Sequence, residues 1–254
     1  MKESEEQLIA YVDADIWVYR ITASCEKPVN WKGDLWTMHC DMAEVKTLID
    51  DAVVDLKERM EADTVVMCFS GPNNFRKKIN PQYKFHRATT RKPMCYVPAI
   101  EYCKENFSSI IEPTLEADDV IGIHTSQDSE IVQRVIVSDD KDLLTVPGWH
   151  WDDDLSTIFF QPLQTANWYF LKQTLTGDAT DNYKGCPKVG PKTAEKILDL
   201  NTDDMSILWS AVKSTYIKAG LTEHDAIMNA RMARILRHGE YENHEPILWS
   251  PYDN

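Results

Sequence analysis

Three short runs of apolar, mostly β-branched residues place the strongest constraint on how this chain can fold. They are LIAYVD, which ends at Asp13, TVVMCFS at 64–70 and RVIVSDD at 134–140, and each stops at a small or acidic residue. Between the first two, the segment 40–62 repeats its apolar residues at helical spacing. Strand–helix–strand alternation indicates a mostly parallel central sheet flanked by helices. We therefore predict an α/β fold, in which ligands bind beyond the carboxyl ends of the strands.

The chain changes character after Pro162. The segments from TANWYFLKQTL to ARMARILRHGEY read as helices joined by tight glycine and proline turns, with no convincing strand. No low-complexity linker separates the two parts, so we expect them to pack as one body. The expected division gives an α/β part at 1–162 and a helical C-terminal part at 163–254.

Composition limits the class of protein. The 254 residues suffice for one large domain or two modest ones, and no apolar run reaches the roughly 20 residues that span a bilayer. The polar N-terminus MKESEEQ has no signal-peptide pattern, so we expect a cytoplasmic protein that does not act at a membrane. Six cysteines without C-x-x-C or zinc-finger spacing are expected to be reduced thiols.

Acidic residues gather where the predicted strands end and helices begin. The stretch TLEADDVIGIH, residues 114–124, places three carboxylates in four positions at the start of a helix. They repel one another unless a positive charge lies among them. Each acidic motif alone also fits a turn or a helix cap, but several of them should reach one edge of the sheet. The set is Asp13, Glu116, Asp118, Asp119, Asp140, Asp142, Asp178 and Asp181.

Clustered carboxylates without cysteine or histidine partners are hard oxygen ligands, which suit Mg²⁺ or Mn²⁺ better than Zn²⁺. Two such ions about 4 Å apart can activate a water molecule and stabilise the leaving oxygen of a phosphodiester. The acids therefore predict a site for two divalent ions.

The charge distribution points to nucleic acid although the net charge does not. The formal net charge is −14, yet no Asp or Glu occurs between Thr64 and Ile100. An acid-free basic segment is the pattern expected for contact with a phosphate backbone. The alternative is a basic loop that acidic neighbours neutralise in the fold. The basic residues of this segment are Arg76, Lys77, Lys78, Lys84, Arg87, Arg91 and Lys92.

Five motifs resemble, in order, those of the flap-endonuclease and 5′-nuclease superfamily. They are YVDADIWVYR, NPQYKFHR, LEADDVIG, VSDDKDLL and GDATDNYKGCPKVGPKTAEKIL. The closest resemblance is to the 5′→3′ exonucleases of podovirus bacteriophages, and it covers almost the whole chain. It implies a helical arch at about 72–108 and a helix–three-turn–helix element at about 170–200.

The resemblance also implies a function. A metal-dependent 5′→3′ exonuclease or flap-type nuclease would hydrolyse phosphodiesters near the 5′ end of duplex DNA, or of RNA in an RNA–DNA hybrid. It would serve phage DNA replication, primer removal or recombination in the host cytoplasm. No particular protein partner is indicated.

Residue roles follow from the matched motifs. The eight acids match the family's metal ligands, and Lys84 and Arg87 match a basic pair that contacts the scissile phosphate. Tyr83 matches an aromatic residue on which a terminal base stacks, and Arg20 matches an arginine of some phage members. The turn 185–192 would hold duplex backbone, often with K⁺ on its carbonyls. The expected DNA contacts are Arg76, Lys77, Lys78 and Arg91 in the basic segment, and Gly185, Val189, Gly190 and Lys192 in the turn.

The basic pair also has a physical rationale of its own. Lys84 and Arg87 are three residues apart, so on a helix they would share a face. Together they could neutralise a phosphate whose charge increases during hydrolysis.

One position departs from the family pattern. An aspartate usually follows the second strand, whereas this chain has CFSGPNNF, with Ser70 and Gly71 at that place. Either a neighbour such as Asp15 replaces it, or one metal site is weaker.

Two other functions remain open at this point. In a haloacid-dehalogenase-type phosphatase, Asp13 of VDAD would be the nucleophile and Asp15 a general acid. That interpretation leaves the EADD acids and the basic segment unexplained. A non-catalytic duplex-binding protein would need no acid cluster.

Overall fold

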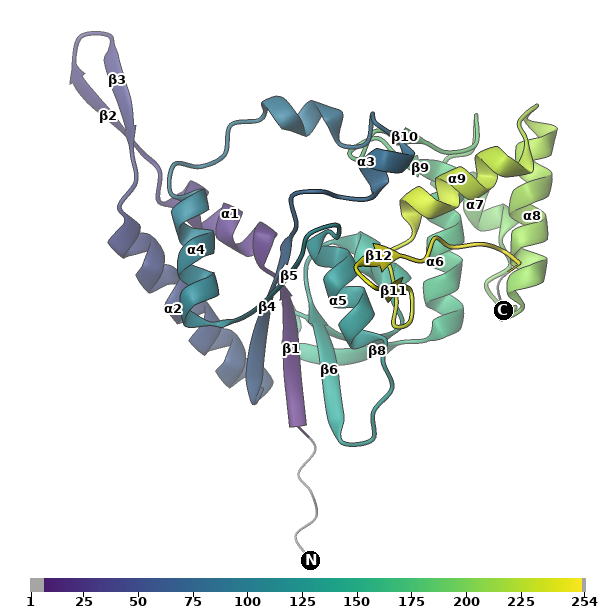
Figure 1. The fold of residues 1–254 in the computed structure, drawn as a ribbon, viewed down its shortest axis with the longest axis horizontal. Coiled ribbons are helices and arrows are strands. Elements are labelled where there is room, and N and C mark those ends of the chain that lie inside the picture. Colours follow the sequence, from purple (N-terminus) through teal and green to yellow (C-terminus); the bar gives the residue numbers. More distant parts are fainter. Residues whose placement is uncertain (1–6, 253–254) are drawn as a thin grey trace, which may run out of the picture.

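Six strands form one sheet in the order β5-β4-β1-β6-β7-β8, and the computed structural model describes residues 7–252 of the chain (Figure 1). Five strands run parallel, and only β8 is antiparallel to its neighbour. The prediction of a mostly parallel sheet is therefore confirmed. The strands are β1 Gln7–Asp13, β4 Thr64–Ser70, β5 Ser108–Glu112, β6 Val132–Val137, β7 Gly148–Asp152 and β8 Thr157–Gln161.

Helices cover both faces of the sheet. α1, α2 and α4 pack against one another and with one face, and α5 packs with β1, β4 and β6 on the other. The helices are α1 Ala14–Ser24, α2 Met42–Met60, α3 Arg76–Ile79, α4 Tyr96–Asn106, α5 Ala117–Thr125, α6 Leu163–Thr176, α7 Pro191–Ile197, α8 Met205–Lys218 and α9 Glu223–Ala233, with 3₁₀ turns η1 Phe85–Thr89 and η2 Lys141–Thr145.

Strand periodicity explains this layering. Successive side chains of a strand point to opposite faces. In β1, Tyr11 belongs to the core under α5, while Ala10 and Val12 belong to the core under α2. Both faces of the sheet are thus apolar. Polar side chains therefore gather at the ends of the strands.

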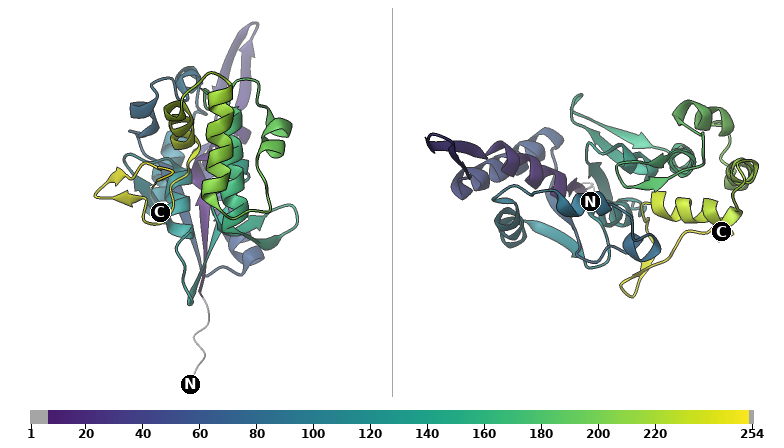
Figure 2. Two further views of the ribbon diagram at one scale, coloured as in Figure 1. Left: turned by 90° about the vertical axis from the view of Figure 1, so that its right-hand side faces the viewer. Right: turned by 90° about the horizontal axis from the view of Figure 1, so that it is seen from above.

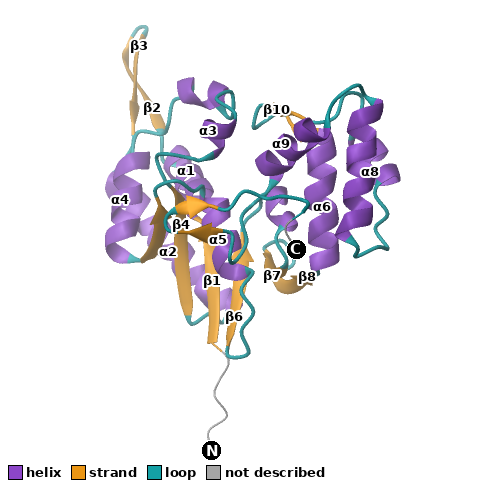
Figure 3. Cartoon of the chain, turned by 45° about the vertical axis from the view of Figure 1, so that its right-hand side comes forward, coloured by secondary structure: helices purple, strands orange, loops and turns teal. Residues whose placement is uncertain are grey.

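The C-terminal part forms a helical layer beside the sheet, with α6, α8 and α9 around their own core (Figure 2, Figure 3). Tyr216 of α8 is buried, and its hydroxyl donates to the carbonyl of Thr174 in α6 at 2.6 Å. The predicted division at residue 162 falls between β8 and α6. No helix among residues 7–252 is long and apolar enough to cross a membrane.

The expectation that the second part contains no strand is wrong in detail. Two short antiparallel pairs occur there, β9 Gly177–Asp178 with β10 Tyr183–Lys184, and β11 Tyr241–Glu242 with β12 Glu245–Pro246. The first depends on glycine, because a Cβ on Gly177 would lie 2.1 Å from the Gly185 nitrogen. Two-residue strands are too short to produce a periodic sequence signal.

The segment 72–108, expected to be a helical arch, is helical only in pieces. α3, η1 and α4 are separated by irregular chain that crosses the carboxyl edge of the sheet (Figure 1). Pro81 and Pro93 lie in it, and proline disfavours helix in the residue before it.

A hairpin that the sequence analysis does not anticipate lies between α1 and α2. Its strands are β2 Lys27–Lys32 and β3 Leu35–His39, and it projects away from the body (Figure 1).

Candidate active site at the carboxyl edge of the sheet

The acidic side chains are placed by the ends of strands and the starts of helices. Asp13 is the last residue of β1 and caps α1, accepting from the Ile16 N–H at 3.3 Å. Asp140 follows β6 and caps η2 by accepting from the Asp142 N–H at 2.9 Å. Glu116 is the N-cap of α5 and forms a capping box with Asp119.

Part of the acid set lines one hollow of about 370 Å³. Its carboxylates come from the N-terminal end of η2 and from β9 and the loop that follows it, so the sheet part and the helical part both contribute. The lining includes Asp140, Asp142, Asp178 and Asp181 together with Arg20 and Arg87.

Three of the acids have no cationic partner. Among residues 7–252, no lysine or arginine forms a salt bridge with Asp13, Asp118 or Asp140. Burial, together with the charges of Asp15 and Asp140, raises the pKa of Asp13 to about 7. Burial and the charge of Asp13 also raise the pKa of Asp118. At this end of the cluster, buried carboxyl groups therefore lie close together without an ion-pair partner and hold their protons more tightly than isolated carboxyls do.

The donor set fits hard divalent cations. It consists of carboxylate oxygens, the ligands that Mg²⁺ and Mn²⁺ prefer. Within the described part of the chain, no three acidic, imidazole or thiol side chains are already drawn together as a closed ligand group. The acids form an open cluster, held together by the fold against their mutual repulsion.

The other end of the cluster is neutralised by the protein's own cations. Lys84 Nζ lies 2.6 Å from Glu116 Oε1 and 3.4 Å from Asp181 Oδ2. Arg87 Nη2 lies 2.9 Å from Asp181 Oδ1. Burial alone would raise the pKa of Glu116, but Lys84 and Arg76 outweigh it and lower the pKa to about 2.

Asp142 and Asp178 share a weaker partner. Lys141 Nζ lies 2.7 Å from Asp142 and 3.6 Å from Asp178, but the lysine side chain is 75% exposed. Such an exposed cation is easily displaced. Asp178 also accepts from the Thr180 N–H at 2.6 Å, which holds its carboxylate at the start of the GDATD turn.

The prediction of Asp119 as a metal ligand is not supported by its position. Asp119 is fully buried and accepts two bonds from Arg76, at 2.6 and 2.8 Å. It also accepts from the N–H groups of Glu116 and Leu236. These four hydrogen bonds occupy both carboxylate oxygens, so Asp119 has a structural role.

The prediction of Arg76 as a DNA contact is wrong for the same reason. Its side chain is 3% exposed and also donates to the carbonyls of Met232 and Arg234. The guanidinium joins the basic segment, α5 and the end of α9, and it does not face solvent.

Tyr83 also differs from its expected role. Its ring is buried in the core of the helical layer, so a terminal base cannot stack on it. Its hydroxyl donates to Glu116 at 2.8 Å and to Asp181 at 3.0 Å. Tyr83 therefore joins two acids that come from different parts of the chain.

Lys84 and Arg87 meet Asp181 without sharing a helical face. Lys84 precedes η1 with a φ of 51°, a left-handed conformation. This backbone conformation turns Lys84 inward while Arg87 stays about half-exposed. The expected pairing of the two cations is present, but its geometric basis is different.

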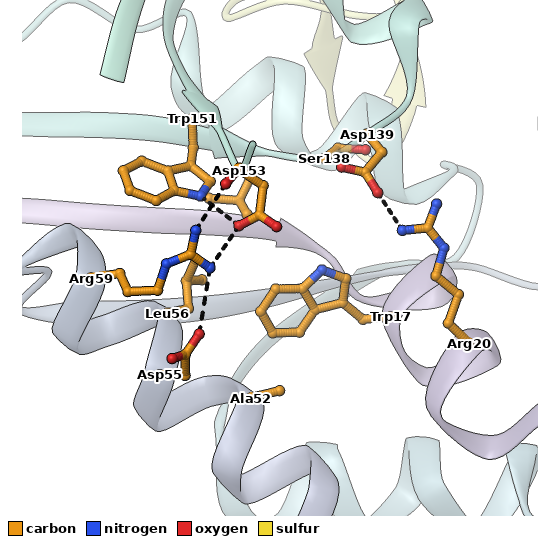
Figure 4. Close-up of a pocket in the computed structure, with 11 residues that line it drawn as sticks. Trp17, Arg20, Ala52, Asp55, Leu56, Arg59, Ser138, Asp139, Trp151 and Asp153 are labelled. Atoms are coloured by element: carbon orange, nitrogen blue, oxygen red, sulfur yellow. Dashed lines mark hydrogen bonds and ion pairs between the residues drawn. The ribbon is translucent and has the colours of Figure 1, made fainter. Parts of the chain in front are cut away.

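Arg20 lies between two hollows. It forms an ion pair with Asp139, and both side chains are more than half exposed. Both residues line the acid hollow and also a second hollow of about 200 Å³. Figure 4 shows Trp17 and Trp151 in the second hollow, with Arg59 tied to Asp55 and Asp153.

Asp15 lies beside Ser70, the position at which the family pattern departs in this chain. Its carboxylate accepts from the Ser70 N–H at 2.9 Å and from the Tyr96 hydroxyl at 3.1 Å. Gly71 could not carry an aspartate without rearrangement, because a Cβ there would lie 2.0 Å from the Glu112 carbonyl oxygen. In the sequence, Asp15 could be identified as the second acid of the VDAD motif. No sequence motif identified Tyr96 as a residue of the site.

The remaining predicted DNA contacts divide between free and occupied groups. Lys77 is exposed, and Lys78 is exposed with only a 3.9 Å contact to Glu245. Arg91 is exposed, but both of its terminal nitrogens bind Glu26. The basic segment is thus partly neutralised by acidic neighbours, as the alternative interpretation allowed.

The turn 185–192 is similarly divided. The Val189 N–H donates to the Cys186 carbonyl, and its side chain packs on the helical core, so the prediction of Val189 as a main-chain DNA contact is wrong. At Gly185, a side chain would collide with the backbone, because a Cβ there would lie 2.3 Å from the Gly177 nitrogen. Gly190 and Lys192, at the start of α7, are exposed.

Comparison with known proteins gives a consistent assignment. The family model for the N-terminal, resolvase-like domain of 5′-3′ exonucleases matches residues 10–151, more than half of the chain. An exodeoxyribonuclease of Enterobacteria phage T3 is 32% identical over 97% of this chain and 94% of its own length. An exonuclease of Escherichia phage T7 is 31% identical over 97% of this chain and 95% of its own.

A solved structure of T5 5′-exonuclease superposes with a TM-score of 0.63 at 16% identity, covering 89% of both chains, which shows a shared fold. With two nearly full-length relatives and a matching family model, the haloacid-dehalogenase alternative has no support. The chain belongs to the 5′-3′ exonuclease family, within the flap-endonuclease and 5′-nuclease superfamily.

Proposed function

We propose that this chain hydrolyses phosphodiesters near the 5′ end of duplex DNA, in 5′→3′ direction and at 5′ flaps, with two Mg²⁺ or Mn²⁺ ions. One observation carries the proposal. Asp140, which follows β6 and has no salt-bridge partner among the described residues, lines the same hollow as Arg87 and Asp181, and Asp181 also pairs with Lys84. Hydrolysis of a phosphodiester needs both the carboxylates and the cations. The carboxylates bind the metal ions, and the cations neutralise the charge of the phosphate.

Asp13, Asp118 and Asp140 would hold one ion, with Asp15 in place of the missing family aspartate. Asp142 and Asp178 would hold the other, after displacing the exposed Lys141. Two ions so held would lower the pKa of a water molecule and stabilise the leaving oxygen. Burial and the repulsion between neighbouring carboxylates raise the pKa of Asp13 and Asp118, and this supports the assignment because a bound cation would offset both.

Lys84 and Arg87 would move from carboxylates to phosphate. Asp181, a partner of both cations, lines the acid hollow, so a phosphate bound there offers them an alternative anion nearby. Arg87 suits a bidentate contact with phosphate oxygens, while Lys84 acts as a point charge. Tyr83 would position Glu116 and Asp181 during this exchange.

Duplex would lie along exposed donors beside the acid cluster. Lys77, Gly190 and Lys192 are exposed, and they come from both parts of the chain. Phosphate contacts of this kind position a duplex without reading its sequence. Relatives of this fold support a DNA substrate, since a T5 flap endonuclease was solved with DNA and metal ions. RNA–DNA hybrid as a second substrate and K⁺ on the carbonyls of the turn 185–192 belong to the same proposal.

The decisive experiment is a time course on duplex DNA labelled at each 5′ end in turn and at each 3′ end. With Mg²⁺, label should leave first from the 5′ ends, and excess chelator should stop the reaction. Asp140→Asn should reduce turnover by orders of magnitude while duplex binding survives. Asp128→Asn, an acid in an exposed loop, is the matched control. Hydrolysis that continues in chelator, or that starts at 3′ ends, would refute the proposal.

A further inference from the structure

The hairpin of β2 and β3 carries four large apolar side chains that nothing else in the described chain covers. Trp31 and Leu35 are each 61% exposed, Trp36 is 58% exposed and Met38 is 39% exposed. Exposed apolar residues scattered singly are ordinary, but a group of them on one projecting element marks a binding surface. Figures 1 and 3 show that the hairpin stands clear of the sheet and of the helical layer.

The hairpin presents one indole on each of its faces. Trp36 lies opposite Asn30 and Thr37 opposite Val29, so Trp36 and Thr37 point to opposite faces. The Trp31 Nε1–H donates to the Thr37 hydroxyl at 2.7 Å, which fixes Trp31 on the face of Thr37. A two-stranded ribbon with an indole on each face suits flat ligands better than a helix or an apolar protein core.

The base of the hairpin is tied to the basic segment. Glu26, directly before β2, accepts bonds at 2.7 and 2.6 Å from Arg91 and one at 2.8 Å from the Met94 N–H. Lys92 is exposed beside them. Lys27, the first residue of β2, pairs with Glu44 at 2.7 Å, whereas Lys32 near the tip has no salt-bridge partner in the described chain. Two exposed cations without a salt-bridge partner in the described chain therefore accompany the indoles, Lys92 beside the foot of the hairpin and Lys32 near its tip.

The hairpin also lies at the substrate edge of the fold. It is joined to Asp13 through α1, whose 11 residues span about 16 Å at 1.5 Å per residue. It projects on the side where the parallel strands end (Figure 1).

We propose that Trp31 and Trp36 are stacking platforms for unpaired bases of the DNA substrate, while Lys32 and Lys92 hold the adjoining phosphates. The proposal rests on the proposed function and deepens it, because it names a single-stranded part of the substrate. Aromatic side chains next to a basic surface are the usual means of binding single-stranded nucleic acid without sequence preference.

An abasic strand separates stacking from charge, since it keeps the phosphates and lacks the bases. Binding would be measured by fluorescence anisotropy in chelator on three ligands: a blunt duplex, the duplex with an oligodeoxyadenylate tail, and the duplex with an abasic tail of equal length. Trp31→Ala/Trp36→Ala should weaken binding of the base-bearing tail by about tenfold or more. Binding of the other two ligands should hardly change.

Two further variants keep the test specific. Trp31→Phe/Trp36→Phe should retain most of the affinity for the base-bearing tail, because phenylalanine can still stack. Ile207→Ala/Ile217→Ala removes two side chains of α8 that are 56% and 52% exposed, and it should affect no ligand. Melting temperatures of all variants would show whether each is folded.

An equal loss on all three ligands, or no loss on any, would overturn the proposal. A wild-type dimer that the double alanine variant dissociates, seen by sedimentation, would also overturn it and make the hairpin a self-association surface. Failure of the proposed function would appear elsewhere, as absence of hydrolysis of the blunt duplex by wild-type protein in Mg²⁺.

Discussion

Arg76 and Asp119 form a buried ion pair with two hydrogen bonds, Nη1–Oδ2 at 2.6 Å and Nη2–Oδ1 at 2.8 Å. Neither side chain is more than 3% exposed. The pair connects the basic segment to α5, and through the carbonyl of Met232 it also reaches the end of α9. The sheet part and the helical part that together carry the acids are thus joined beneath the site.

Removing one partner of this pair should destabilise the protein strongly. Asp119→Ala would leave Arg76 charged and buried, which typically costs about 3–5 kcal/mol. Chemical denaturation would measure the loss. Lys77→Ala, an exposed member of the same segment, should change stability by less than about 0.5 kcal/mol. If Arg76 were a DNA contact, Arg76→Ala would instead weaken duplex binding with little effect on stability.

The sequence was sufficient for elements whose pattern is long and local. β1, β4 and α2 were predicted because their apolar residues repeat over enough positions to define a period. The start of α5 was predicted from its acids, which cap the first turn. The β2–β3 hairpin was missed, since an exposed ribbon has no buried face and therefore no apolar alternation.

The sequence could not separate the roles of neighbouring acids. Asp118 and Asp119 are adjacent on α5, and a helix turns about 100° between them. Asp118 consequently points to the uncompensated acids, while Asp119 points to Arg76, 43 residues away in sequence. Only the tertiary structure supplies that partner. The same holds for Tyr83, whose sequence context does not show that its ring is buried in the helical layer.

Lys84 should act on chemistry more than on affinity. It is mostly buried and lies 2.6 Å from Glu116, whereas exposed lysines such as Lys77 can hold the duplex. Lys84→Ala should lower the single-turnover rate at saturating enzyme by about 100-fold or more, with little change in the binding isotherm. Lys77→Ala is the matched control and should leave the rate unchanged. An unchanged rate with weakened binding would make Lys84 a tether for DNA.

Divalent ions should stabilise the fold. Ligand that binds only the folded state adds about 2.7 kcal/mol at 100 times its dissociation constant, so Mg²⁺ should raise the melting temperature. Asp118→Asn should melt higher than wild type in chelator, because it removes repulsion with Asp13, and it should gain less from Mg²⁺. A melting temperature indifferent to millimolar Mg²⁺ would show that the acids do not form a metal site.

Mild acid should destabilise the protein through His150. Burial lowers the pKa of this side chain, whose Nε2 lies 3.0 Å from the Val146 carbonyl oxygen. The unfolded chain takes up a proton near the ordinary pKa of about 6.5, while the folded protein stays neutral. Stability should therefore fall as the pH drops below that value. Denaturation curves between pH 7 and 5 should show a smaller fall for His150→Gln, and an identical fall would contradict the assignment.

Asp15 should contribute to metal binding in place of the aspartate that Gly71 cannot provide. Its carboxylate accepts from the Ser70 N–H and the Tyr96 hydroxyl, and an asparagine oxygen could accept both bonds. Asp15→Asn should thus preserve the structure but remove the charge. The Mg²⁺ concentration for half-maximal thermal stabilisation should rise by about 10- to 100-fold.

Asp139→Asn, at the same edge but paired with the exposed Arg20, is the matched control and should change this Mg²⁺ concentration little. The exchange Asp15→Ser/Ser70→Asp returns a carboxylate to the end of β4, where the family pattern has one, and should recover part of the loss. If Asp15→Asn binds Mg²⁺ as wild type does, the missing acid has no replacement and the site works with fewer ligands.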